Sequence, residues 1–167
     1  MNKIIELLKD FTRINNSSLE IIIIGGLALE YYGMKDRTTF DLDAEVKGEV
    51  EKLFIFLKSK GIPADISENI SGWSIISLAP EYRERTQVVY KDERLSVKVL
   101  NQIDFIIAKL RRSTEEDIND ALFIAKKFNI KSEDIQKNAD EAIKNSPKDT
   151  ALFVFKKNIE FFIKELP

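Results

Sequence analysis

The chain contains no cysteine and no histidine among its 167 residues. These absences exclude disulfide bonds, Ser-His and Cys-His nucleophile pairs, and zinc sites built from sulfur and imidazole ligands. Any chemistry must therefore use carboxylates, lysines, hydroxyls and metals that prefer oxygen ligands. No apolar run approaches the length of a membrane span, and the first residues lack the apolar core of a signal peptide. We therefore expect a cytoplasmic protein that does not enter a membrane.

Net charge and chain length further limit the kinds of protein that this sequence can be. The formal net charge is −2, so the average field gives no reason to expect a dedicated binder of duplex DNA. The hydrophobic content of 44% is ordinary for a globular protein. The length is sufficient for one well-packed domain that carries a helical appendage.

Hydrophobic periodicity divides the chain into two regions. Residues 1–100 have the pattern of an α/β region, and residues 101–167 have the pattern of helices throughout. In the first region we expect helices at 2–13, 27–32 and 49–59, and strands at 19–24, 40–46, 64–67, 73–78, 87–91 and 95–99. In the second region we expect helices at 101–112, 114–128, 132–145 and 148–165. Ser113 or Thr114 is expected to cap the second of these helices, and Ser132 the third.

The most informative segment lies between residues 21 and 43. Four isoleucines form a buried strand that ends at Gly25-Gly26, where a bare backbone lets N–H groups approach an anion. Farther on, the second strand carries Asp41-Leu42-Asp43. Because side chains alternate along a strand, the two aspartates point to the same face, where a divalent cation would relieve their repulsion. A phosphate-binding turn followed by paired carboxylates is typical of metal-assisted phosphoryl transfer.

This segment resembles the signature of the nucleotidyltransferase (polymerase-beta-like) fold, in which two glycines follow the first strand and Asp-x-Asp lies on the second. Arg37-Thr38-Thr39, just before the acids, is similar to the version in small AbiEii/MenT toxin-related transferases. The resemblance implies an α/β (α+β) fold, with a mixed sheet, flanking helices and a C-terminal helical bundle. It implies that Asp41 and Asp43 hold Mg²⁺ or Mn²⁺. It also implies a nucleoside triphosphate whose phosphates contact Gly25, Gly26, Arg37, Thr38 and Thr39.

A second cluster lies where the helical region begins. Lys109 flanks the buried stripe of its helix, and Asp117 and Asp120 lie one turn apart on the next helix. The pattern resembles the segment that completes the nucleotide site in the toxin-related transferases. By that resemblance, Lys109 contacts triphosphate oxygens, and Asp117 orients Lys109 or acts as a base toward the acceptor. The alternative is a surface lysine with solvated acids, one of them favoured by the helix N-terminus.

The position of a third carboxylate is left open by the sequence. Members of the broader fold carry one on a later strand, and Asp65 has the local pattern, an acid between apolar residues. Either Asp65 is a third metal ligand, or the site uses two acids together with Lys109 and Asp117. An inactive relative is a further alternative.

The last helix is apolar around much of its circumference. Leu152, Phe155, Ile159, Phe162 and Leu166 form one stripe, and Phe153, Phe161 and Ile163 are among the residues that widen it. Such a helix is buried on two sides or forms an interface. A homodimer or a cognate antitoxin bound through this helix is therefore expected.

The leading functional hypothesis is Mg²⁺-dependent transfer of a nucleoside monophosphate from an NTP to an acceptor, with RNA, tRNA or protein as the acceptor. The resemblance suggests a toxin–antitoxin or phage-defence setting. The alternatives are an antibiotic-type nucleotidyltransferase that modifies a small molecule and a catalytically inactive binding module.

Overall fold

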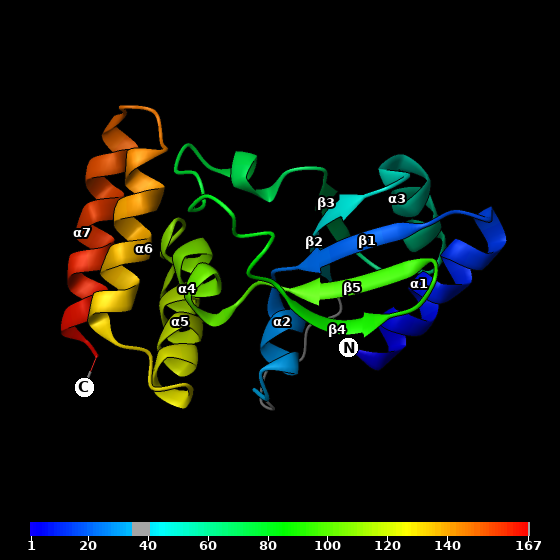
Figure 1. Cartoon of the computed structure of the whole chain (residues 1–167), viewed down its shortest axis with the longest axis horizontal. Coiled ribbons are helices and arrows are strands. Elements are labelled where there is room, and N and C mark those ends of the chain that lie inside the picture. Colours follow the sequence, from blue (N-terminus) through cyan, green and yellow to red (C-terminus); the bar gives the residue numbers. More distant parts are fainter. Residues whose placement is uncertain (35–40, 167) are drawn as a thin grey trace. The chain divides into compact units, whose positions relative to one another are not determined.

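The computed structural model describes residues 1–34 and 41–166, which form two compact units (Figure 1). Unit 1 comprises residues 1–70 and 86–100, and unit 2 comprises residues 71–85 and 101–167. Each unit is considered by itself below. Arg37, Thr38 and Thr39, which the sequence assigns to phosphate binding, lie outside the described residues.

Unit 1 is built on a five-stranded mixed sheet with the strand order β3-β2-β1-β5-β4 (Figure 1). The central strand β1 pairs antiparallel with β2 and parallel with β5, β2 pairs parallel with β3, and β4 pairs antiparallel with β5. This confirms the predicted mixed α/β class. The strands are β1 (Leu19–Ile23), β2 (Leu42–Lys47), β3 (Ala64–Ser67), β4 (Gln87–Lys91) and β5 (Leu95–Val99).

Three helices flank this sheet, namely α1 (Asn2–Asn15), α2 (Gly26–Tyr31) and α3 (Val50–Ser59). α1 contacts β5, α2 contacts β2, and α3 contacts β3. The apolar face of α1 is buried through Leu8 and Phe11, as its helical spacing predicts. Beyond the end of β5, the hydroxyl of Tyr32 donates a hydrogen bond to the carbonyl of Leu100. This bond ties the end of α2 to the residue that follows β5.

Residues 73–78 do not form the predicted strand. The short 3-10 helix η1 (Ile70–Trp73) is followed by irregular chain, and serine hydroxyls accept its backbone N–H groups. Ser71 Oγ accepts from Leu78 N at 2.9 Å, and Ser146 Oγ accepts from Ser77 N at 2.9 Å. Local side-chain hydrogen bonds of this kind offer the backbone an alternative to a sheet. The prediction was wrong because serine side chains, and no neighbouring strand, accept these backbone N–H groups.

Unit 2 consists of segment 71–85 and four helices, α4 (Gln102–Leu110), α5 (Glu115–Lys127), α6 (Ser132–Lys144) and α7 (Thr150–Lys164). α4 lies at its centre and contacts α5, α6 and α7, with Phe105 and Ile106 fully buried. Within the described ranges, no helix is long and apolar enough to cross a membrane.

The helix caps of unit 2 match the sequence at one position and not at another. Thr114 caps α5 in a capping box with Asp117, as predicted. Ser132 is not a cap, because it is already the first residue of α6 and extended Lys131 holds the cap position without a side-chain hydrogen bond.

A buried carboxylate attaches segment 71–85 to the helices of unit 2. Asp104 is fully buried on α4 and accepts two hydrogen bonds from Arg85, from Nε at 2.9 Å and from Nη2 at 2.8 Å. Asn138 of α6 donates a third at 3.1 Å. A bidentate arginine–carboxylate pair is among the stronger polar contacts in proteins. It therefore fixes the end of the segment to two helices.

Candidate active site

The predicted glycine turn and acid pair meet at one end of the sheet of unit 1. β1 ends at Ile23, and Gly25 and Gly26 lead the chain directly into α2. The backbone N–H of Ile24 donates to the carbonyl of Asp43 at 3.0 Å, which places β2 alongside the turn. Gly25 and Asp43 are therefore neighbours, although eighteen positions separate them in the sequence.

The carboxylate of Asp43 occupies the space that a side chain at position 25 would fill. A Cβ on Gly25 would lie 2.2 Å from Oδ2 of Asp43 and 2.9 Å from its Cγ. Both distances are far shorter than van der Waals contact. Only glycine at position 25 therefore allows the carboxylate to lie directly against the turn between β1 and α2.

Asp41 and Asp65 are the other two acids that the sequence assigns to the metal. Leu42, the first residue of β2, is fully buried and Asp43 is half-buried. Asp41 is exposed and lies just before β2, although the sequence predicts it within the strand. The parallel register of β2 and β3 places Asp43 opposite Asp65, which is exposed. Side chains at paired positions of neighbouring strands share a face. Asp65 is thus the position on β3 from which a carboxylate could join Asp43.

These residues fit a hard cation as a carboxylate pair. Asp41, Asp43 and Asp65 offer only oxygen donors, which Mg²⁺ prefers, and Mg²⁺ commonly completes its shell with water and substrate phosphates. Across residues 1–34 and 41–166, no three acidic side chains converge closely enough to hold a metal ion. The role of Asp65 as a third ligand stays a prediction.

Glu45, which the sequence analysis did not select, continues the acidic face of β2. It is 6% exposed, and its Oε2 accepts a hydrogen bond from the backbone N–H of Ile70 at 3.0 Å. Strand alternation after Asp41 and Asp43 is the signal that could have identified it. Because Ile70 is the first residue of η1, Glu45 fixes the connection after β3 to the strand that carries the acid pair.

Lys109 and Asp117 lie together in unit 2, within a buried group of charges. Lys109 is 7% exposed, and its Nζ lies 3.1 Å from Asp117 Oδ1 and 2.7 Å from Asp120 Oδ2. Asp120, which the sequence left undecided, is therefore an ion-pair partner of Lys109. Arg112 was not selected from the sequence. Its Nε and Nη2 donate to Asp117 at 2.9 and 2.7 Å.

The environment of Asp117 favours its ionised form. Burial alone would raise the pKa of this carboxyl group, but hydrogen bonds from Arg112, Thr114 and Lys109 outweigh burial and hold its pKa well below the ordinary value of 3.8. Asp117 also belongs to the first turn of α5, where a negative charge is favoured. The carboxylate thus organises Lys109, Arg112 and the start of α5.

This depressed pKa predicts a pH-dependent contribution of Asp117 to stability. The contribution is complete at neutral pH, and it is lost as the pH falls below 3.8, because the unfolded chain then binds protons that folded Asp117 does not. In urea unfolding from about pH 7 to about pH 3, Asp117→Asn should therefore be less stable than wild type by an amount that shrinks in acid. Glu93→Gln, at an exposed acid outside the helices, is the control and should show little change. A constant difference between wild type and Asp117→Asn at all pH values would contradict this role.

The selected residues thus fall into two groups. Gly25, Gly26 and Asp43 come together in unit 1, with Asp65 paired to Asp43 by register. Lys109 and Asp117 come together in unit 2. Each group is defined by contacts within its own unit.

Comparison with known proteins gives one match. The model of a family described as "Nucleotidyltransferase of unknown function (DUF6036)" matches residues 1–161, nearly the whole chain. No curated protein and no solved structure matches the chain.

Proposed function

Because the chain belongs to this family of nucleotidyltransferases of unknown function, we propose that it transfers a nucleoside monophosphate from an NTP to an acceptor in a reaction that requires Mg²⁺ or Mn²⁺. The observation that carries the proposal is the packing of the Asp43 carboxylate against Gly25. In this contact a carboxylate lies against the turn between β1 and α2, the turn to which the proposal assigns phosphate binding.

In this proposal, Asp41 and Asp43 hold the cation as a pair, and water and substrate phosphates complete its coordination shell. The bound cation would neutralise phosphate charge and align the reacting groups. Gly25 and Gly26 bind phosphate through their backbone, together with Arg37, Thr38 and Thr39. The Asp43 carboxylate fills the space that a Cβ at Gly25 would occupy, so this glycine supports the position of the metal ligand. The assignment of phosphate to Gly25 and Gly26 rests on the family resemblance.

Lys109 and Asp117 have proposed roles from the same family resemblance. Lys109 would neutralise charge on the leaving pyrophosphate, and Asp117 would hold the lysine in position. The 3.1 Å contact between them supports the positioning role of Asp117. Asp120 makes the shorter contact with Lys109, so we extend the positioning role to Asp120.

For the acceptor we propose RNA, with tRNA as the first candidate, or a protein, and for the setting a toxin–antitoxin or phage-defence system in the cytoplasm. These proposals rest on the similarity of Arg37-Thr38-Thr39 and Asp41-x-Asp43 to the toxin-related transferases. One observation favours a second candidate, a catalytically inactive nucleotide-binding module: no three acids converge on a metal position among the described residues.

Conservative replacement of the paired acids tests the proposal. Asp41→Asn and Asp43→Asn should each abolish Mg²⁺-dependent NTP binding, measured by titration calorimetry, because each removes half of the carboxylate pair. The metal-free melting temperature should hold or rise slightly, since two like charges no longer repel. Asp10→Asn on α1, whose acid pairs with Arg13, is the matched control and should bind NTP like wild type.

Activity distinguishes the two candidates. Wild type is incubated with each labelled NTP, Mg²⁺ and total tRNA. Label on the RNA that disappears in Asp43→Asn supports the transferase. Nucleotide binding without transfer to RNA or protein supports the inactive module, and no binding of any NTP overturns both candidates.

A further inference from the structure

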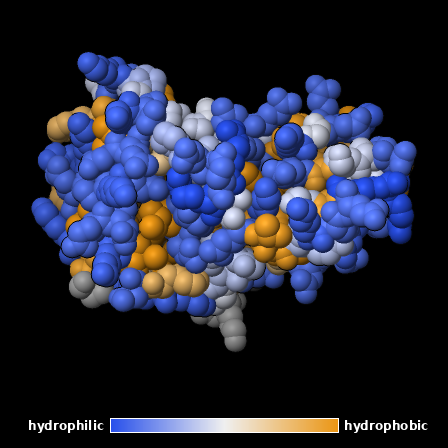
Figure 2. Space-filling model, viewed as in Figure 1, coloured by the Kyte–Doolittle hydropathy of each residue, from blue (hydrophilic) through white to orange (hydrophobic). Residues whose placement is uncertain are grey.

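Helix α7 has a second apolar face in addition to the one it buries. Phe155, Ile159 and Phe162 are buried, as predicted. On the outer side, Phe153 is 65% exposed, Val154 56% and Phe161 63%. Hydrophilic side chains predominate on the surface shown in Figure 2, where hydrophobic ones form small patches. Three large exposed apolar side chains on one helix therefore mark α7 as a candidate interaction surface.

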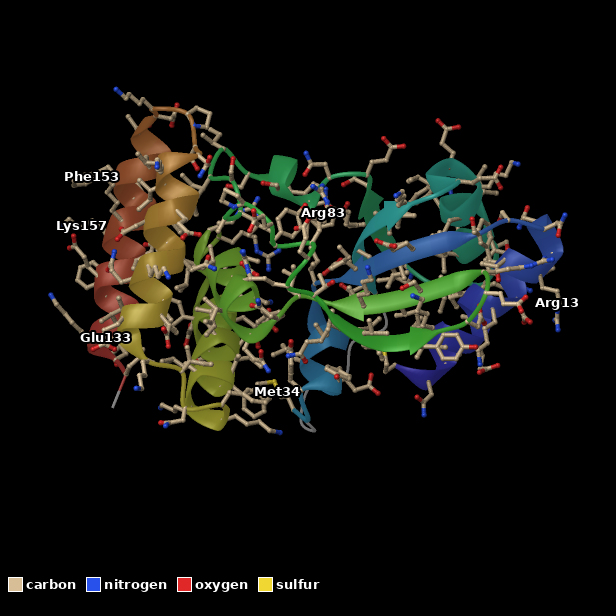
Figure 3. The ribbon with its side chains drawn as sticks, in the orientation of Figure 1. Arg13, Met34, Arg83, Glu133, Phe153 and Lys157 are labelled. Atoms are coloured by element: carbon tan, nitrogen blue, oxygen red, sulfur yellow. The ribbon has the colours of Figure 1, made fainter. Side chains whose placement is uncertain are left out.

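Two lysines lie within this outer face. Lys157 and Lys164 follow Phe153 and Phe161 at helical spacing, and the Nζ of each lies 5.8 Å from the centre of the preceding phenylalanine ring. Figure 3 shows Phe153 and Lys157 extending from the same side of α7 into solvent. Lys157 also pairs with exposed Glu160, a surface contact of small energetic weight. The outer face is thus apolar with charges of alternating sign.

The neighbouring helix α6 offers a groove with the complementary pattern. A groove of about 620 Å³ is lined by α6 and by Ile163 of α7. Along its α6 side, Glu133, Lys137, Asp140 and Lys144 alternate in charge. Glu133 and Asp140 are seven residues apart, as are Lys157 and Lys164 on α7. Seven residues correspond to about 10.5 Å along a helix, so both pairs of charges have the same spacing.

We propose that this surface binds a second copy of the chain, with the outer face of α7 from each copy seated on the α6 groove of the other. With α7 antiparallel to the α6 of the partner, Lys157 lies opposite Asp140, Glu160 opposite Lys137 and Lys164 opposite Glu133. All three pairs are of opposite sign in one register, and the two-fold symmetry of a dimer forms each pair twice. Ile163 gives the groove an apolar side for the phenylalanines.

The apolar surface that α7 leaves exposed is available to a second copy of the chain. An aromatic side chain buries about 150–250 Å² when fully covered, and Phe153 and Phe161 each keep almost two-thirds exposed. A two-fold dimer buries these rings, Val154 and the groove residues in two copies, which doubles the apolar area that the interface covers. The interface is independent of the proposed transferase activity.

Charge reversal provides a specific test. Lys157→Glu/Lys164→Glu places acids opposite acids, and Glu133→Lys/Asp140→Lys places lysines opposite lysines. Each double variant alone should be a monomer in light scattering, while wild type should have twice the 19.2 kDa mass of the chain. An equimolar mixture of the two variants should regain the dimer, because every reversed charge then meets its opposite. Phe161→Asp should be monomeric and should stay so in either mixture.

Circular dichroism melting is used to check that each variant is folded. The check matters for Glu133→Lys, because Glu133 lies in the first turn of α6, where an acid is favoured. Recovery of the dimer only in the mixture supports the proposal. Wild type that is monomeric at high concentration overturns it. So do double variants that remain dimeric, or a mixture that remains monomeric.

Discussion

Replacing Lys109 with methionine is expected to lower the free energy of unfolding by about 3–5 kcal/mol, because it leaves buried acids without their shared cation. Lys109 is 7% exposed and contacts both Asp117 and Asp120, which are 0% and 2% exposed. Asp117 keeps its hydrogen bonds with Arg112 and Thr114, which limit its share of the loss. Chemical unfolding monitored by circular dichroism measures the change.

Two further variants test whether the destabilisation comes from the buried ion pairs of Lys109 and not from replacing a lysine as such. Lys126→Met makes the same change at an exposed position of α5 and should alter stability by less than about 0.5 kcal/mol. Adding Asp120→Asn to Lys109→Met should reduce the combined loss below the sum of the two single losses, since the two side chains interact. Additive losses would show that the 2.7 Å contact has no energetic weight. The folded double variant also allows the proposed triphosphate contact to be measured, as weaker binding of an NTP with unchanged binding of the nucleoside.

Gly25→Ala is expected to have the second large effect, on stability and on the site together. The added Cβ would lie 2.2 Å from Oδ2 of Asp43, so the carboxylate or the turn must move. Forcing an extra methyl group into a packed position costs about 1–3 kcal/mol. Because the carboxylate is displaced, the variant should also lose Mg²⁺-dependent NTP binding. Titration calorimetry measures the binding, and thermal unfolding measures the stability.

The source of this effect can be isolated with Asp43→Ala. The double variant with Gly25→Ala removes the clashing Oδ2 and Cγ atoms but keeps the Cβ of residue 43 at 2.9 Å, so it should recover part of the stability that Gly25→Ala loses. Gly61→Ala is a second control, because its Cβ would meet nothing within 4 Å although φ is +68°. That change should reduce stability through the backbone but leave nucleotide binding intact. If Gly25→Ala binds NTP like wild type, the close contact has no role in the site.

The sequence predicted the regular elements well wherever hydrophobic spacing alone decides the structure. The apolar run before Gly25 and the alternation in Leu95–Val99 both became strands, and all four C-terminal helices were found. The strand predicted at residues 73–78 does not form, because two serine hydroxyls far apart in the sequence, at positions 71 and 146, accept the backbone N–H groups of Leu78 and Ser77. That outcome depends on tertiary packing, which a local pattern does not contain.

The candidate site also has features that the sequence could predict and features that only the fold determines. Gly25 and Asp43 could be selected from their order in the chain, but their direct packing depends on the register of β1 against β2. Lys109 and Asp117 could be paired by resemblance. The inclusion of Arg112 depends on the tight turn at Ser113, whose φ is +52°. Sequence patterns therefore selected the candidate residues, and the fold determines which of them are neighbours.

The order in which the chain visits the two units has a consequence for dissecting the protein. The backbone passes from one unit to the other at residues 70–71, 85–86 and 100–101, so no single cleavage separates them. Deleting residues 101–167 would remove the helices but leave segment 71–85 attached to the sheet, with Arg85 deprived of Asp104. Segment 71–85 is thus inserted in the sequence of unit 1 but folds as part of unit 2. Excising it together with the helices, and joining residue 70 to residue 86 by a short linker, is the dissection that respects this connectivity.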